Sequence, residues 1–120
     1  MSDPITTAAD FSRLLEADVS RRLGDANLTL TRYATLTRAD EATVAELAQQ
    51  VGVTQQMVSK TVRDLRLLGY VDQAAGKDRR QRLLQITKRG RAALALASAL
   101  DLPPALLAAM ETYVAAAVTS

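Results

Sequence analysis

The chain of 120 residues contains no cysteine and no histidine. Without thiols it cannot form disulfides, bind a metal through thiolates or sense oxidants through a cysteine. Without imidazoles it lacks the commonest zinc ligand and the usual general base. Ser59 and Lys60 make no catalytic pair, because adjacent side chains on a helix diverge by about 100°. The acidic residues form no defined pair either, so we expect no catalytic residue, no metal, no cofactor and no enzymatic activity.

Aromatic residues are also scarce, at 3% of the chain, whereas 48% of the residues are hydrophobic. The core must therefore be built from Leu, Val and Ala, a composition that favours helices. The N-terminus shows no signal pattern, and no apolar run reaches the roughly 18 residues of a membrane span. We expect one soluble domain over residues 1–120, located in the cytoplasm (the prokaryotic cytosol or nucleoid).

The net charge of +2 conceals an uneven distribution. Between Lys60 and Arg91 ten basic residues face three acidic ones, a local charge of +7, so the remainder of the chain carries −5. A split of this kind indicates that one side of the molecule binds a polyanion.

The stretch from Thr43 to Gly69 predicts two helices joined by a short turn. Thr43 and Glu46 have the spacing of a capping box. Gly52 is expected to end the first helix in the left-handed conformation, and Thr54 to cap the second helix. The apolar residues of the first helix recur at helical spacing and predict one buried face. They are Val44, Leu47, Ala48 and Val51.

The second helix separates its side chains by chemistry, with an apolar inward stripe and a polar, basic open face that has no acid in its first two turns. Amides, hydroxyls and cations are the groups that hydrogen-bond base edges and phosphates. We interpret this helix as the recognition helix of a helix-turn-helix, although a solvated face in an unrelated protein has the same composition. The inward residues are Val58, Thr61, Val62, Leu65 and Leu68. The candidate DNA-binding residues are Thr54, Gln55, Gln56, Ser59, Lys60 and Arg63.

After Gly69 the apolar period changes from 3.6 to two, which predicts strands at residues 70–74 and 81–86. A turn with Gly76 near its tip joins them. A basic hairpin directly after a recognition helix is typical of the wing of a winged helix, whose arginines reach a minor groove or a phosphate. The alternative is a surface hairpin whose cations only protect an edge strand from aggregation. The candidate wing residues are Lys77, Asp78, Arg79, Arg80 and Arg82.

Two helices are predicted before the helix-turn-helix. Residues 1–6 are expected to be a frayed end, followed by a helix over residues 7–23 that Thr7 or Asp10 caps. The second helix has Thr29 as its N-cap. Its inward side is expected to contain Leu30, Tyr33, Ala34 and Leu36.

Two more helices are predicted after the hairpin. The first, capped by Thr87, covers residues 88–100 with Leu94, Ala97 and Leu100 as its apolar line. The second begins at Pro104, because proline suits the first turn of a helix, and continues to residue 118. Its apolar face is too broad to remain exposed in a soluble monomer, so this helix and the first one are expected to form a dimer interface unless they fold back on the core. The candidate interface residues are Phe11, Leu14, Leu15, Leu106, Leu107, Met110, Tyr113 and Val114.

Several of these segments resemble the MarR family of winged helix-turn-helix transcriptional regulators. The similarity covers about residues 28–91 and includes the segments Leu28-Thr29-Leu30, Val53 to Ser59 and Gly69-Tyr70-Val71. Its most specific part is Asp78-Arg79-Arg80 followed by Leu84-x-Ile86-Thr87-Lys88-Arg89-Gly90.

The resemblance implies a homodimer whose recognition helices enter successive major grooves of a pseudo-palindromic operator. It also implies that Arg80 enters the minor groove and that Asp78 orients its guanidinium, since residues i and i+2 share one face of a strand. In the family the helix after the wing is usually long, whereas here Pro103 and Pro104 interrupt it. The resemblance further implies control by a small molecule, whose identity the sequence does not indicate.

The predicted fold class is mainly α with a small β-hairpin wing. Residues 28–91 would form the winged-helix core, and residues 7–24 and 92–118 the dimerisation helices. The leading hypothesis is a dimeric, sequence-specific repressor of transcription that binds double-stranded DNA. In the alternative hypothesis the chain is a winged-helix protein–protein interaction module or anti-repressor whose basic face meets an acidic protein.

Overall fold

The computed structural model describes residues 3–76, 82–97 and 101–119. Most of this part is helical, and its two strands form one antiparallel hairpin, so the predicted fold class is confirmed. The elements in chain order are α1 (Pro4–Leu23), the 3-10 turn η1 (Gly24–Ala26), α2 (Leu30–Leu36), α3 (Val44–Val51), α4 (Gln55–Leu67), β1 (Val71–Ala75), β2 (Arg82–Ile86), α5 (Lys88–Ala97) and α6 (Pro104–Thr119).

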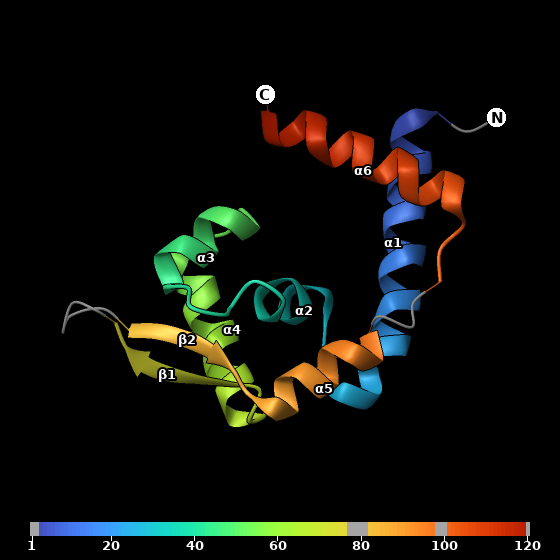
Figure 1. Ribbon diagram of the computed structural model, residues 1–120. Helices are drawn as coiled ribbons and strands as arrows, with labels where there is room; N and C mark the ends of the chain where they lie inside the picture. Colours follow the sequence, from blue (N-terminus) through green and yellow to red (C-terminus); the bar gives the residue numbers. More distant parts are fainter. Residues whose placement is uncertain (1–2, 77–81, 98–100, 120) are drawn as a thin grey trace.

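The elements form two groups at opposite ends of the molecule (Figure 1). At one end, α2, α3 and α4 pack together, with the β1–β2 hairpin against the C-terminal part of α4. At the other end stand α1 and α6, close to both termini (Figure 1). The short helix α5 leads from the hairpin towards α1, and it contacts both α1 and α2.

The core lies between α2, α3, α4 and the hairpin. Its largest fully buried side chains include Leu36, Leu47, Leu65 and Leu84, one from each of α2, α3, α4 and β2. Burying a leucine side chain stabilises the fold by roughly 1.5–3 kcal/mol, so these four positions hold the helix-turn-helix and the hairpin together as one unit.

The start of α1 differs from the predicted one. The helix begins at Pro4, with Asp3 as its N-cap, because an Asp-Pro pair supplies both a capping carboxylate and a residue suited to the first turn. Hydrogen bonds from the backbone and hydroxyl of Thr6 lower the pKa of the Asp3 carboxyl. This contribution to helix stability is present above the unfolded pKa of Asp3 and is lost as the pH falls through the lower, folded pKa. The prediction of a frayed end over residues 1–6 was wrong for residues 3–6, which lie in the described part, and the predicted caps at Thr7 or Asp10 were wrong.

One inward position was also predicted incorrectly. Leu30 is 38% exposed, whereas Leu28, which precedes the N-cap Thr29, is buried. The backbone N–H of Leu28 donates to the carbonyl of Leu23 at 3.1 Å, which turns this side chain inward before the helix begins. In α5 the residue in the core is Ala93. On the predicted apolar line, Leu94 is half-buried, and the Ala97 and Leu100 side chains lie outside the described part.

The hairpin is held in register by five residue pairs, from Val71 opposite Ile86 to Ala75 opposite Arg82. The loop before α3 adds to this sheet: the N–H of Glu41 donates to the Leu84 carbonyl at 2.7 Å, and the N–H of Leu84 donates to the Ala42 carbonyl at 2.9 Å. The loop therefore protects part of the β2 edge. In the described ranges no helix is long and apolar enough to cross a membrane.

Candidate nucleic-acid interface

The turn between α3 and α4 has the predicted chemistry. Both hydrogen bonds of the capping box are present: the Glu46 N–H donates to the Thr43 hydroxyl, and the Thr43 N–H donates to the Glu46 carboxylate, each at 3.1 Å. Gly52 ends α3 in the left-handed conformation, with φ of 78°. The Thr54 hydroxyl accepts the Met57 N–H at 3.2 Å and caps α4. These local contacts fix where α4 begins and at which angle it leaves α3.

Packing then fixes the rotation of α4 about its axis. Val58, Val62 and Leu65 are buried, as predicted for the inward stripe. On the flank of the helix, a half-exposed ion pair joins Asp64 to Arg32 of α2 at 3.4 Å, and the same guanidinium donates to the Asn27 carbonyl at 2.8 Å. With one face buried against the core, the opposite face of α4 must point into solvent.

That opposite face carries the predicted polar and basic residues. Every one of them is exposed, and Gln56, Ser59, Lys60 and Arg63 also line a shallow hollow of about 450 Å³. The fifth residue of the hollow is Met57, which was not predicted to belong to the interface. An apolar residue in the first turn of a recognition helix but outside its inward stripe is the signal that would have identified it. The exposed candidates from the sequence are Thr54, Gln55, Gln56, Ser59, Lys60 and Arg63.

The predicted wing is present as a hairpin directly after α4. Arg82 begins β2, opposite Ala75, and its side chain is exposed. The remaining wing candidates, Lys77, Asp78, Arg79 and Arg80, lie outside the described residues. The roles of these four residues therefore stay predictions.

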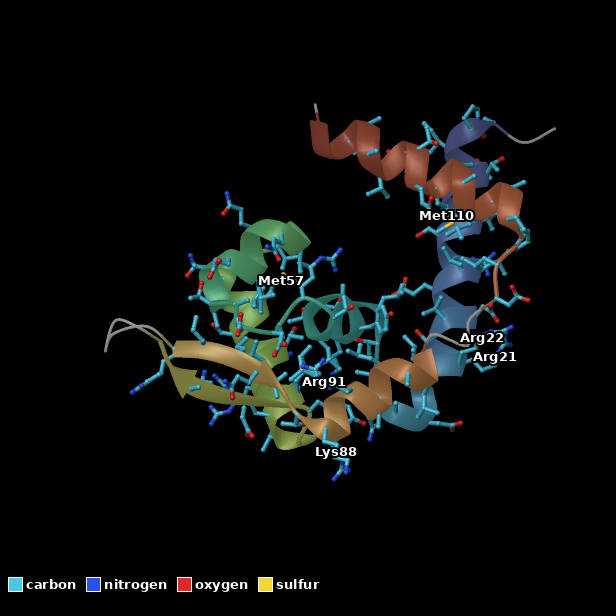
Figure 2. The ribbon with its side chains drawn as sticks, viewed as in Figure 1. Arg21, Arg22, Met57, Lys88, Arg91 and Met110 are labelled. Carbon is cyan, nitrogen blue, oxygen red and sulfur yellow. The ribbon has the colours of Figure 1, made fainter. Side chains whose placement is uncertain are left out.

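Asp40, which was not predicted as a site residue, lies in the loop before α3 and contacts both β2 and α5. One carboxylate oxygen accepts the Ile86 N–H at 3.2 Å, and the other lies 3.0 Å from the guanidinium of Arg91 on α5, which Figure 2 labels. The next residue, Glu41, has a positive φ of 61°, a conformation that is uncommon for a residue with a side chain. These partners are 46 and 51 positions away in sequence, so no local pattern marks Asp40.

Replacing Asp40 is expected to loosen the hairpin. Asp40→Ala removes the acceptor for the Ile86 N–H and the partner of Arg91, and we expect a loss of about 1 kcal/mol in the free energy of unfolding. Most of this loss comes from the hydrogen bond, because the ion pair is about half exposed and contributes little. Urea unfolding of Asp40→Ala and Asp40→Asn separates the two: Asn keeps a neutral acceptor and should lose less than Ala. Equal losses would contradict the primary role of the hydrogen bond.

A second candidate surface is formed by the outer faces of α1 and α6. In residues 104–117 no side chain is fully buried, although this helix is strongly apolar. Tyr113 is 77% exposed and Val114 57% exposed, whereas Met110 is half-buried (Figure 2). On α1, Phe11 and Leu14 are exposed, but Leu15 packs partly against the core of its own chain. The remaining predicted interface residues are Leu106, half-buried, and Leu107, exposed.

Comparison with known proteins agrees with this geometry. The model of the MarR family matches residues 34–81. The chain is 46% identical over 71 residues to the LexA repressor of Deinococcus radiodurans, an alignment that covers 56% of this chain and 32% of that protein. The chain thus spans about a third of the length of this curated relative.

Solved structures show the same fold over nearly the whole chain. The M. tuberculosis transcriptional regulator MosR, crystallised in complex with DNA, has 25% identity and a TM-score of 0.69, with 98% of each chain covered. The S. aureus MepR–DNA complex has 13% identity and a TM-score of 0.77, covering 98% of this chain and 95% of that one.

A helix-turn-helix with an exposed second helix, followed by a β-hairpin, defines a winged helix-turn-helix protein. Among proteins of this class, the chain is similar to the MarR family, whose model matches residues 34–81 and whose members are among its structural neighbours. The family and these neighbours are transcriptional regulators and not enzymes.

Proposed function

We propose that this protein is a transcriptional regulator, acting as a repressor, that binds double-stranded DNA with sequence specificity. The observation that carries the proposal is the outer face of α4, where amide, hydroxyl and ammonium groups are all exposed and the first two turns contain no acid. These groups match the donors and acceptors on base edges in the major groove. Binding to DNA would place the protein in the prokaryotic cytosol or nucleoid.

Each residue of the interface has a proposed role. Gln55, Gln56, Ser59 and Lys60 lie in the first half of α4, the end of a recognition helix that contacts base edges. Thr54 and Arg63 contact phosphates or the wall of the groove, and Arg79 and Arg82 contact backbone phosphates. Arg80 enters the minor groove with Asp78 orienting it, and Lys77 adds positive charge at the wing tip.

The active form is proposed to be a homodimer. Residues 28–91 form the winged-helix core of the single domain 1–120, and residues 7–24 and 92–118 supply the dimer interface. The exposed apolar side chains of α1 and α6 support this assignment, because a soluble chain rarely leaves so much apolar surface uncovered. A twofold dimer presents two recognition helices to a pseudo-palindromic operator. A small-molecule effector, of unidentified chemistry, would act on the same assembly.

A binding selection from random DNA duplexes tests the proposal, with light scattering to measure the oligomeric state. At about 150 mM salt, a specific dimer should enrich a pseudo-palindrome. The alternative result is weak binding that enriches no sequence and disappears steeply as the salt concentration increases. It would mean that the protein is held only by nonspecific attraction to DNA phosphates, and it would contradict sequence-specific regulation. Retention of an acidic protein partner in excess nonspecific duplex would favour the interaction-module alternative.

Residue roles are tested by substitution on the selected operator. Gln56→Ala and Lys60→Ala are expected to reduce discrimination between the operator and its single-base variants by about 1–3 kcal/mol, because each removes hydrogen bonds to one base edge. The matched control is Arg82→Ala, which should weaken binding to all sequences alike. Fluorescence anisotropy titrations against a panel of operator variants measure both effects. If Gln56→Ala and Lys60→Ala keep the wild-type order of preferences, the recognition-helix assignment is wrong.

A further inference from the structure

Met57 is an apolar residue on the proposed DNA-reading surface that the roles above leave unexplained. It is the third residue of α4 and is 52% exposed. The core-facing residues of this helix are Val58, Val62 and Leu65, and Met57 is not among the partly buried hydrophobic residues that pack against the core. Its side chain therefore contributes little to the fold of the single chain.

The position of Met57 relates it to the base-reading residues. It lines the same hollow as Gln56, Ser59 and Lys60, in the first turn of α4 beside α3 (Figure 2). Two hydrogen bonds hold the backbone of Met57 in place: its N–H donates to the Thr54 hydroxyl, and its carbonyl accepts a hydrogen bond from the Thr61 hydroxyl. The side chain itself has three rotatable bonds and a polarisable sulfur, so it can adapt to a neighbouring surface.

The chemistry of the major groove offers one partner for such a side chain. The edges of the four base pairs present hydrogen-bond donors and acceptors, and the C5-methyl group of thymine is the apolar group among them. A base pair contacted by Gln56 or Lys60 brings its neighbours within reach of Met57, because all three side chains border one hollow.

We infer that Met57 is a specificity-determining residue that packs against a thymine C5-methyl group in the operator. This inference rests on the proposed DNA binding and adds an apolar contact to its polar ones. It predicts that the operator contains a thymine, in each half-site, whose methyl group contributes to affinity only when Met57 is present.

The experiment removes single methyl groups from the DNA. Each thymine of the selected operator is replaced in turn by deoxyuridine, which keeps every hydrogen-bonding group, and the dissociation constants are measured for the full chain and for Met57→Ala. At one thymine of each half-site the wild type should lose about fourfold in affinity per methyl, the effect of about one buried methyl-sized group. Met57→Ala should bind the thymine and deoxyuridine duplexes equally at that position.

The chain offers a matched control on the same helix. Leu67 is 82% exposed and lies ten residues further along α4, roughly 15 Å away along the helix axis. Leu67→Ala also removes an exposed apolar side chain, yet it should keep the wild-type ratio between thymine and deoxyuridine duplexes. Circular dichroism of each variant verifies that the helices are intact.

The possible outcomes distinguish a failure of the Met57 inference from a failure of the proposed DNA-binding function. If the wild type binds the operator specifically but every deoxyuridine substitution has the same effect on the wild type and on Met57→Ala, the methyl contact is refuted and the DNA-binding function stands. If the wild type selects no sequence at all, the proposed function fails and the inference fails with it.

Discussion

Gly90→Ala is expected to destabilise the protein by roughly 3 kcal/mol, at the upper end of the cost of overpacking. A Cβ atom at this position would lie 2.2 Å from the carbonyl oxygen of Tyr70 and 3.0 Å from Cγ2 of Ile86. The first of these neighbours is backbone, which cannot rotate away as a flexible side chain can. Helix α5 would have to move away from the start of β1, and the higher helix propensity of alanine, about 1 kcal/mol, does not offset this displacement.

The displacement would break a group of hydrogen bonds at the base of the hairpin. The Thr87 N–H donates to the Tyr70 carbonyl at 3.0 Å, and the Thr87 hydroxyl donates to the Gly69 carbonyl at 2.6 Å. The same hydroxyl accepts the Gly90 N–H at 3.0 Å and so caps α5. Because these bonds join α4, the hairpin and α5, we expect the wing and the recognition helix to lose their fixed relation before the remaining helices unfold.

Urea unfolding at a fixed protein concentration measures this effect, since the stability of a dimer depends on concentration. Gly24→Ala is the matched control: a Cβ there meets nothing within 4 Å, and its φ of −58° is ordinary for alanine. We expect this control to be neutral or slightly stabilising, by at most about 1 kcal/mol. An unfolding midpoint for Gly90→Ala equal to that of Gly24→Ala would refute the close packing of α5 on Tyr70.

The parts of the fold that could be predicted from the sequence are those that neighbouring residues determine. The capping box of Thr43 and Glu46, the left-handed Gly52 and the cap at Thr54 act over three or four residues, so their spacing alone indicated where α3 ends and α4 begins. The helical spacing of the apolar residues in α4 likewise predicted which face of the helix is buried. The exposed candidates on that helix followed directly from these two local features.

Other features depend on contacts between distant residues, or on a local signal that was misinterpreted. Asp40 is a feature of the first kind, because only the complete fold brings its partners, Ile86 and Arg91, near it. Leu30 was predicted to face inward, but it is exposed, and Leu28, which precedes the helix, is buried instead because the chain turns it inward. The Asp3–Pro4 pair was a readable helix start, so that error came from interpretation and not from missing information.

Introducing charge on the apolar face of α6 is expected to separate the proposed dimer and to reduce operator affinity by at least about 100-fold, because each subunit would then bind its half-site alone. The double substitution Leu107→Glu and Val114→Glu places both charges on one face, seven residues or two helical turns apart. Both side chains are exposed in the single chain, at 43% and 57%, so the fold of each subunit should survive. Light scattering should then give a mass near 12.9 kDa, that of one chain.

Two comparisons attribute the loss to dimerisation. Thr112→Glu adds a charge to the opposite, exposed face of the same helix, and it should leave both the mass and the operator affinity at wild-type values. On a duplex with only one half-site, the wild type and the double variant should bind with similar affinity, since the recognition helix is far from α6 (Figure 1). A double variant that still binds the full operator as the wild type does would show that α6 is not the interface. In that case the apolar face of α6 would need a different partner to cover it, because α6 makes little contact with its own chain.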